Sequence, residues 1–523
     1  MVRRAMVAFD KVAIDRNEGN KVLHRGGKAR HLFKAVLDGG IDGVGRSQSM
    51  TAEQVRELLL ACTRPKVSLP HPVRIRNFRI AGSLDLSHLR LAYDLDLTGC
   101  AISGGLVLTG TTIGAVDLSG TEMDALLAAN TRLGGDLVLH QARIGQANQY
   151  EPTSSWQEFR SRRGDQVQTP TSTPDRDVVA PVTLTSSRVE GDVVLSKSTI
   201  RTGEPWAIYA PRLQASGSFI ANSLRATGGI NLWEAKLENS IVLDGAEVGA
   251  VDASIVTVSG GFFAGYGFVA SGPVDLLAMR AGNIVTFHDS ELRGSPTSAN
   301  LTRLTTSRLR LDTRTAPSGR LILRDVRVSS LIDSASTWPV DGDLDLEGLG
   351  YDRIGATESL AVRERIGWLT RDPEVSAASF ERLAAYYQSA GDERSARTVR
   401  LTRERHLLHH QHFAGRVWGR TQDALFGYGF APARALLWLA AIVGTGAWWF
   451  SGHPVRPLKQ HEHPTWDPFV YALDLVVPIV DLGQEKAWDP VGTDKVVAMA
   501  LVVAGWLLAT AVVAGARRLL SRT

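Results

Sequence analysis

The sequence predicts a mainly β fold: a right-handed quadrilateral β-helix (a solenoid), then an α-helical linker and a transmembrane helical hairpin. Three observations predict this order. Apolar residues recur about every five positions from Ile80, the period becomes helical after Gly355, and two long apolar runs follow. We therefore divide the chain into an N-terminal segment with a capping helix (1–70), the solenoid (71–355), a basic helical linker (356–426) and the hairpin (427–523).

The overall composition is that of a folded chain able to bury a large core. Hydrophobic residues make up 44% and charged residues 21%, and 50 glycines against 21 prolines indicate many tight turns. Cys62 and Cys100 form neither a disulfide framework nor a metal-binding spacing, which favours a reducing compartment. The N-terminus lacks the apolar stretch of a secretory signal.

A five-residue period carries the solenoid prediction. Apolar residues are spaced by five or six positions in one block and repeat this spacing from Leu232 to Val258. Neither an α-helix nor a hairpin meander has this period. The first block consists of Leu86, Leu91, Leu97, Ile102, Leu108, Ile113, Leu118, Met123, Ala128, Leu133, Leu139 and Ile144.

Such a period is typical of a chain wound into a square coil. Each side is a three-residue strand with one inward Leu or Ile, and Gly, Ser, Thr, Asn and Asp supply the corners. Inward residues of successive coils stack into a continuous core. Four sides need about 20 to 22 residues, so roughly 11 turns between 80 and 350 make a rod on the order of 50 Å long.

This spacing resembles the pentapeptide-repeat family, which implies a quadrilateral β-helix. The sequence departs from the A(D/N)Lxx consensus of that family, and the six-residue steps leave the cross-section open. The alternative fold is a leucine-rich β-sandwich.

Two segments interrupt or precede the coil. Residues 146–180 carry Pro, Ser, Thr and charge, which indicates a loop inserted between turns. Residues 49–62 have a helix start signal at Ser49 or Thr51 and an apolar face, so we expect a helix that covers the first coil.

The linker is predicted to be helical and basic. "FERLAAYYQSAGDERSA" looks like one tetratricopeptide-type hairpin with a stop at Gly391; it acts either as a structural adaptor or as a peptide-binding unit. The stretch from Arg394 to Arg420 contains seven arginines and only one acidic residue, Glu404. This excess of positive charge indicates a surface for membrane lipid. The predicted lipid-facing residues are Arg397, Arg400, Arg403, Arg405, Arg416 and Arg420.

Two other interpretations of this stretch have less support. Nucleic-acid binding rests on charge alone, so we predict no nucleic-acid partner. His406 and His410 share a helix face and could ligate a metal, but a polar interfacial helix is the more common meaning of such a run, and we predict no metal site.

The hairpin prediction rests on two apolar runs. Residues 430–450 include sixteen uncharged positions after Arg434, and 496–516 has 21 residues without a charge, followed by Arg517 and Arg518. Arginines flank the outer ends of both runs, which places the solenoid and the C-terminus on the cytoplasmic side of the cell membrane as a two-span protein. A buried soluble hairpin is the alternative.

Between these runs lies "LDLVVPIVDLGQ", residues 473–484. Pro478 separates a possible helix at 469–477 from an extended stretch, a layout that resembles the pore loop of a potassium-channel subunit. The TVGYGD filter of that family is absent, and an interfacial loop packed on the two helices is the alternative. The candidate pore-loop residues are Asp474, Pro478, Asp481 and Gly483.

No motif identifies an enzyme. A P-loop, a dinucleotide-binding glycine motif, C-x-x-C, H-E-x-x-H and G-x-S-x-G are all missing, so we assign no catalytic residue and no cofactor. The plan of the chain, with "GYG…P…ALLWL" and "LDLVVPIVDLGQ" near its end, resembles an actinobacterial-type family labelled membrane-associated oxidoreductase, which implies redox activity.

Together these observations favour a membrane-anchored solenoid that acts as a non-catalytic scaffold or interaction surface at the inner face of the membrane. Its expected partners are membrane lipid and either another protein or a second copy of the chain, bound through the solenoid. The two alternatives are a membrane oxidoreductase and a pore-loop channel or sensor gated by the solenoid.

Overall fold

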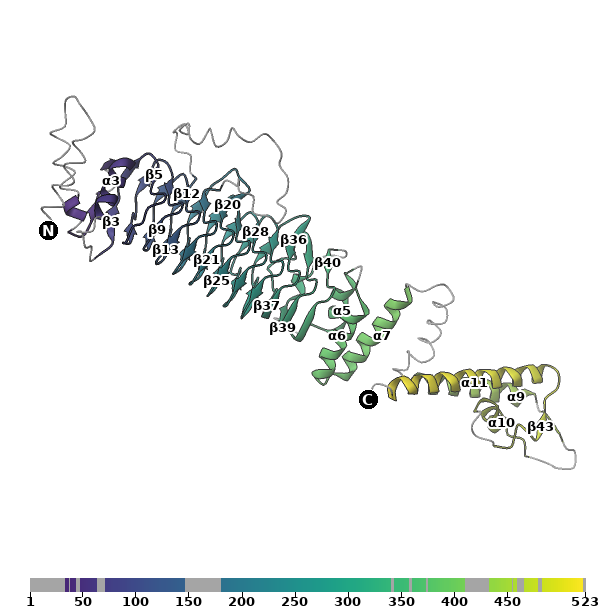
Figure 1. Cartoon of the computed structure of the whole chain (residues 1–523). Coiled ribbons are helices and arrows are strands. Elements are labelled where there is room, and N and C mark those ends of the chain that lie inside the picture. Colours follow the sequence, from purple (N-terminus) through teal and green to yellow (C-terminus); the bar gives the residue numbers. More distant parts are fainter. Residues whose placement is uncertain are drawn as a thin grey trace, which may run out of the picture. The chain divides into compact units, whose positions relative to one another are not determined.

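The computed structural model describes most of the chain in two compact units, Met1–Ser379 and Phe380–Thr523, which we treat separately (Figure 1). The described residues are 33–36, 38–43, 48–63, 71–145, 180–339, 343–356, 360–372, 375–409, 432–453, 455–458, 465–477 and 482–520.

The first unit is a parallel β-solenoid of about 11 turns, as the period predicts. Each turn supplies one short strand to each of four ladders, and each strand pairs with its counterpart in the next turn. Leu84 pairs with Leu106 and Leu106 with Leu126, so these two turns are 22 and 20 residues long. The β-sandwich alternative is wrong because the strands of successive turns pair in parallel throughout the described part of the solenoid. The handedness stays a prediction.

The four ladders follow one another along each turn. Ladder 1 contains β5 (Leu84–Asp85), β8 (Leu106–Val107), β12 (Leu126–Leu127), β16 (Val182–Thr183), β20 (Trp206–Tyr209), β24 (Gly229–Asn231), β28 (Val251–Asp252), β32 (Val274–Asp275), β36 (Thr297–Asn300), β38 (Arg320–Ile322) and β40 (Leu344–Asp345). Ladder 2 contains β9 (Thr112–Ile113), β13 (Arg132–Leu133), β17 (Arg188–Val189), β21 (Gln214–Ala215), β25 (Lys236–Leu237), β29 (Thr257–Val258) and β33 (Arg280–Ala281).

Ladder 3 contains β1 (Ile41–Asp42), β3 (Val73–Arg76), β6 (Leu95–Asp96), β10 (Val116–Asp117), β14 (Leu137–Val138), β18 (Val193–Val194), β22 (Phe219–Ile220), β26 (Ile241–Val242), β30 (Phe262–Phe263) and β34 (Ile284–Thr286). Ladder 4 contains β2 (Ser49–Thr51), β4 (Arg79–Ala81), β7 (Ala101–Ile102), β11 (Glu122–Met123), β15 (Arg143–Ile144), β19 (Thr199–Ile200), β23 (Arg225–Ala226), β27 (Glu247–Val248), β31 (Val269–Ala270) and β35 (Glu291–Leu292).

In the last three turns the corner between ladders 2 and 3 straightens. The longer strands β37 (Thr305–Arg310), β39 (Arg327–Asp333) and β41 (Gly350–Ala356) run through both ladders, since β37 pairs with β33 at its start and with β34 at its end. Here the two sides form one continuous face.

The core confirms the predicted inward positions and adds a second set. Every member of the first apolar block is buried, from Leu86 to Ile144. Sides on ladders 1 and 3 bury two residues each, for example Leu84 with Leu86, where we expected one. The reason is strand alternation: in "LDL" both leucines point inward and the central Asp points outward.

Left-handed backbone recurs at corners along the solenoid, and glycine occupies some of these positions. Gly110 has φ 68°, and at the equivalent position of a later turn Ile255 has φ 60° with 46% of its surface exposed. Replacing Ile255 with Asn should stabilise the solenoid by about 1 kcal/mol, because a β-branched residue is strained in this region. A urea unfolding midpoint measures the gain, and Ile255→Val, which keeps the β-branch, should show none.

Both ends of the solenoid are covered. At the N-terminal end α3 (Ala52–Cys62) begins at Thr51, whose hydroxyl accepts a hydrogen bond from the Gln54 amide, and Tyr93 donates to the Leu59 carbonyl at 2.8 Å. At the other end η3 (Ala335–Thr337) and α5 (Val362–Thr370) follow the last long strands.

A buried ion pair holds the C-terminal cover in place. Arg365 of α5 donates to both carboxylate oxygens of Asp333, at 3.0 and 3.2 Å, and Asp333 is fully buried. The indole of Trp338 donates to the same carboxylate and stacks on Trp368 with ring centroids 4.7 Å apart. Burial raises the pKa of Asp333, although the charge of Arg365 opposes this shift.

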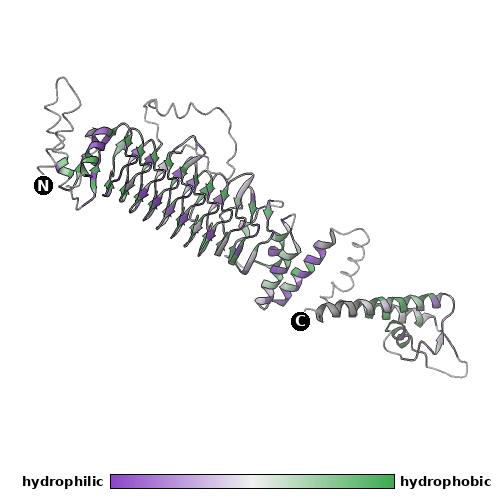
Figure 2. Ribbon diagram, viewed as in Figure 1, coloured by the Kyte–Doolittle hydropathy of each residue, from purple (hydrophilic) through white to green (hydrophobic). Residues whose placement is uncertain are grey.

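The helices after the solenoid form a pair of mixed hydropathy and an apolar hairpin (Figure 2). The pair is α6 (Ala377–Ser389) and α7 (Glu393–His409), separated at Gly391, whose φ is 79°. The hairpin contains α9 (Pro432–Gly452), β42 (Arg456–Pro457), α10 (Pro468–Val476), β43 (Trp488–Asp489) and α11 (Thr493–Leu520).

Candidate interaction surfaces

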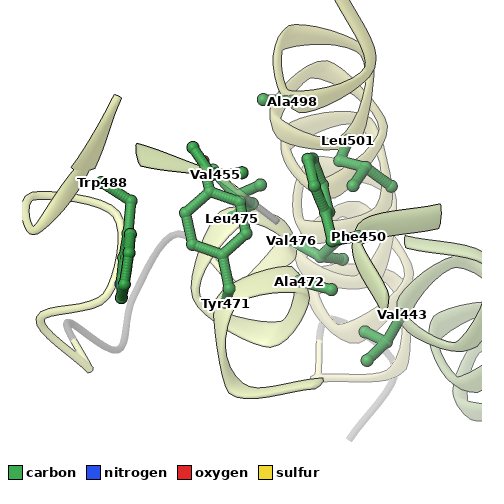
Figure 3. Close-up of a cluster of buried hydrophobic side chains, with 10 residues drawn as sticks. All are labelled: Val443, Phe450, Val455, Tyr471, Ala472, Leu475, Val476, Trp488, Ala498 and Leu501. Atoms are coloured by element: carbon green, nitrogen blue, oxygen red, sulfur yellow. The ribbon is translucent and has the colours of Figure 1, made fainter. Parts of the chain in front are cut away.

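The hairpin is a packed unit in which α10 contacts both long helices. Its aromatic centre joins Phe450 of α9 to Tyr471 of α10, with ring centroids 4.9 Å apart, and Trp466 packs on Trp488 at 4.7 Å. The predicted helix after residue 469 is therefore a buried wedge (Figure 3). The core residues are Val443, Phe450, Val455, Tyr471, Ala472, Leu475, Val476, Trp488, Ala498 and Leu501.

Two glycines allow this close packing. A Cβ on Gly446 of α9 would lie 3.0 Å from Cβ of Ala472, and a Cβ on Gly505 of α11 would lie 2.1 Å from the carbonyl oxygen of Val476. Small residues at helix contacts let backbones approach, as is common where helices associate within a bilayer.

Asp474 ties the end of α10 to the segment that returns toward α11. Oδ1 of Asp474 accepts a hydrogen bond from the Leu482 amide at 2.7 Å, and Oδ2 accepts from the Gln484 and Glu485 amides at 2.8 Å each. The residue is 5% exposed. Among the candidate pore-loop residues, Asp474 is thus engaged by backbone amides.

Of the other three candidate pore-loop residues, the structure describes one. Gly483 lies in this returning segment with φ 76°, a left-handed conformation that favours glycine. Pro478 and Asp481 lie outside the described residues. The pore loop therefore stays a prediction.

Replacing Asp474 with Asn should destabilise the hairpin by about 2 kcal/mol, because charge-assisted bonds to three amides would be lost or weakened. Thermal unfolding in detergent, followed by tryptophan fluorescence, measures this. The exposed Asp489→Asn removes the same charge and should change little; an equal effect of both would contradict the role of Asp474.

Apolar side chains remain exposed along the hairpin. On α11 five residues at helical spacing are more than half exposed, and on α9 Leu437 is 69% and Trp448 74% exposed. Among the described residues one helix, over Thr493–Thr510, is long and apolar enough to cross a membrane, and 17% of that stretch is buried. A core helix of a soluble protein would be mostly buried. The exposed residues on α11 are Val496, Met499, Val503, Trp506 and Leu507.

The basic residues of the linker have mixed surroundings. Arg400 and Arg403 of α7 are 20% and 16% exposed and both contact Glu381 of α6, so they join the two helices. Arg397 and Arg405 are exposed. Arg416 and Arg420 lie outside the described residues.

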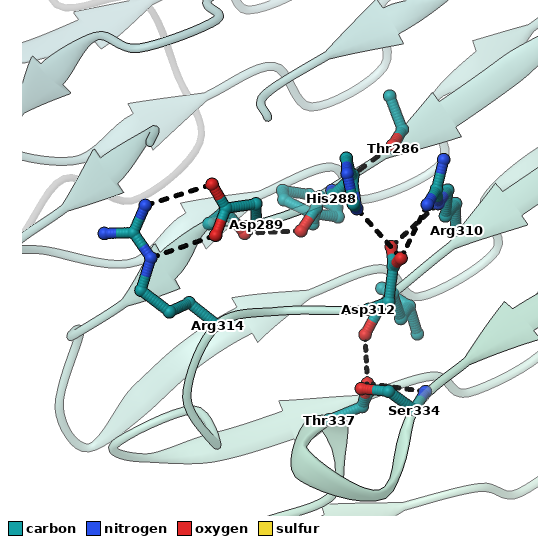
Figure 4. A network of polar contacts seen from close by, with 11 residues as sticks. Thr286, His288, Asp289, Arg310, Asp312, Arg314, Ser334 and Thr337 are labelled. Carbon is teal, nitrogen blue, oxygen red and sulfur yellow. Dashed lines mark hydrogen bonds and ion pairs between the residues drawn. The ribbon is translucent and has the colours of Figure 1, made fainter. Parts of the chain in front are cut away.

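A polar network links turns near the end of the solenoid (Figure 4). Asp312 accepts from His288 Nδ1 at 2.9 Å and from Arg310 at 2.7 and 2.8 Å, while Arg314 binds Asp289 through two bonds of 3.0 Å. Burial opposes ionisation of Asp312, but the bonds from Arg310 and His288 outweigh it and lower the pKa.

The contacts of this network are those of a structural link between turns. Nδ1 of His288 donates a hydrogen bond to the Asp312 carboxylate, so the proton of the neutral ring lies on that nitrogen. Within the described ranges, no hydroxyl or thiol is hydrogen-bonded to the His288 ring. The pair therefore resembles an acid–histidine dyad without a nucleophile.

The exposed face of ladder 2 carries a column of cations. Arg132 pairs with Arg188, and further cations recur at every second turn. All column residues are exposed and none is acidic. In turn order the column is Arg90, Thr112, Arg132, Arg188, Gln214, Lys236, Thr257, Arg280, Thr305 and Arg327.

Sequence reasoning missed this column because register sets it. Arg132 and Arg188 are 56 positions apart (188 minus 132) but occupy adjacent turns, since residues 146–180 fall between them. The only sequence signal is a cation directly before the inward residue of a side. To predict from this signal which cations lie next to each other, one must know the length of every turn between them.

Comparisons with models of protein families, with curated proteins and with solved structures found no match to this chain. The resemblances to pentapeptide-repeat proteins and to membrane-associated oxidoreductases therefore have no support beyond the solenoid itself.

Proposed function

We propose that the chain is a membrane-anchored β-solenoid that acts as a non-catalytic scaffold or interaction surface at the inner face of the membrane. One observation carries the anchor: apolar side chains of α9 and α11 are exposed on the outside of a well-packed hairpin. A contiguous apolar surface of this kind needs a partner, and lipid is the one that long helices fit.

Both helices are long enough for two crossings, although among the described residues only α11 is also apolar enough over a full span. α9 has 21 residues and α11 has 28, which correspond to about 32 and 42 Å, against a hydrocarbon core of about 30 Å. Two crossings return the chain to the side on which it entered. The arginines at 517 and 518 favour the cytoplasmic side for that end.

The scaffold role rests on the solenoid surface. Outward positions repeat at about 4.8 Å per turn over 11 strands of ladder 1, which presents side chains in regular columns. Extended surfaces of this kind are what repeat proteins use for binding.

Membrane extraction tests the anchor. The full chain should stay in the membrane pellet after an alkaline wash and be released by detergent, and Val503→Asp with Leu507→Asp on the exposed face of α11 should shift it toward the soluble fraction. Charges added at the exposed solenoid residues Thr112 and Thr257 are the matched control. A wild-type chain that is soluble and monodisperse without detergent would contradict the anchor.

An absorption spectrum separates the scaffold from the redox alternative. We expect the detergent-purified protein to be colourless. A stoichiometric flavin or haem band would overturn the non-catalytic assignment and leave the anchor untouched.

A further inference from the structure

We propose that an arginine-rich face on the last turns of the solenoid binds anionic phospholipid headgroups and holds the solenoid against the membrane surface. This inference rests on the proposed membrane anchor and adds a second, electrostatic contact. The arginine face consists of Arg280, Arg303, Arg308, Arg327 and Arg353.

Strand register brings these arginines together. Arg280 and Arg327 belong to one column, with Thr305 between them, and Arg308 and Arg353 belong to a second column, with Ser330 between them. Each pair spans two turns, or about 10 Å, and the columns are three residues apart along β37, again about 10 Å. Four of the five cations therefore outline a patch with the hydroxyl side chains of Thr305 and Ser330 between them.

The charges of this face are not neutralised locally. All five arginines are exposed, and none forms an ion pair with another described residue. Asp325 and Asp352 lie beside the face, so five positive and two negative charges leave a balance of +3. The cationic column of ladder 2 continues this face along the rod.

Another face of the same rod behaves differently. On ladder 4 two outward cations meet acids of the adjacent turn: Arg143 contacts Glu122 at 3.0 Å and Arg225 contacts Glu247 at 3.9 Å. In the arginine face the neighbours of the cations within each column are Thr305 and Ser330 rather than acids. The positive charge is therefore not balanced within the columns and is available to an anionic partner.

Anionic lipid fits this face better than nucleic acid. Proteins that bind single strands interleave aromatic side chains with cations, and the exposed described positions around the five arginines are Ser, Thr, Asp, Asn and Gly, with no aromatic side chain among them. A straight row of cations meets a duplex backbone at few points, because each strand winds once in roughly 34 Å. Lipid headgroups diffuse laterally and can occupy every arginine, and the anchor keeps them close.

Energy transfer in reconstituted full-length protein tests the inference. A dye on Ser259→Cys reports the approach of the solenoid to acceptor lipids, and dye attachment is selective because Cys62 and Cys100 are buried. We expect transfer to rise when neutral nanodiscs are replaced by nanodiscs containing phosphatidylglycerol, and to fall again in high salt.

The decisive variant carries Arg280→Gln, Arg308→Gln, Arg327→Gln and Arg353→Gln. Each arginine near an anionic surface contributes a factor of roughly five to the ratio of docked to undocked solenoid, so the loss should exceed a hundredfold. The matched control removes four exposed arginines near ladder 4: Arg79→Gln, Arg143→Gln, Arg201→Gln and Arg225→Gln. It should keep the response to anionic lipid.

Three results would overturn the inference. Energy transfer could be the same in neutral and anionic nanodiscs, or it could stay high in the four-arginine variant. The third result is binding of duplex DNA by the arginine face in neutral nanodiscs, without a response to phosphatidylglycerol. Failure of the anchor is a separate outcome, since it would show as protein that does not float with neutral vesicles.

Discussion

Replacing Gly505 with leucine should destabilise the hairpin by about 3 kcal/mol or more. The side chain would enter the space filled by the carbonyl of Val476, which lies 2.1 Å from the position of a Cβ, and backbone cannot move aside as a flexible side chain can. We expect α10 to separate from α11. Unfolding of the full chain in detergent, followed by the fluorescence of Trp466 and Trp488, measures the loss.

Gly444 provides the matched control. It lies in α9, is exposed, and has no neighbouring atom within 4 Å of the position that a Cβ would take, so Gly444→Leu should cost under 1 kcal/mol. Equal effects of the two leucines would show that α10 is not wedged against α11.

Replacing Arg365 with methionine should cost the solenoid about 3–5 kcal/mol. The change leaves the carboxylate of Asp333 buried without its cation, and the penalty for an unpaired buried charge is large. Burial already raises the pKa of Asp333, and loss of Arg365 should raise it further. Urea unfolding followed by circular dichroism measures the change.

Two further variants make this prediction specific. Arg363→Met, on an exposed position of the same helix, should stay within about 0.5 kcal/mol of the wild type. Adding Asp333→Leu to Arg365→Met should recover most of the stability, because apolar replacement of a buried pair is often neutral. A double variant as unstable as the single one would contradict the ion-pair explanation.

The solenoid could be predicted because its signal is local. Inward residues such as Leu86 and Leu97 recur within one turn, and each turn repeats the pattern. The second set of inward residues could not be predicted from a five-residue spacing. Leu84 and Leu86 lie two positions apart on the same side of the coil, and both are buried in the core.

The surfaces were harder to predict because they depend on register and on partners far along the chain. The sequence made Asp474 a candidate pore-loop residue, yet its partners are amides 8 to 11 positions later, beyond Pro478. Arg400 and Arg403 read as lipid contacts, but Glu381 on the preceding helix engages both. The arginine face draws on four separate turns of unequal length.

The most direct test of the central claim, an anchor that crosses the membrane twice, is the sidedness of the two ends in sealed vesicles. Protease should digest the solenoid and a C-terminal epitope together in inside-out vesicles and spare both in right-side-out vesicles. Digestion of one end only would mean a single crossing and would contradict the hairpin anchor, and digestion of both ends in both orientations would contradict a cytoplasmic solenoid.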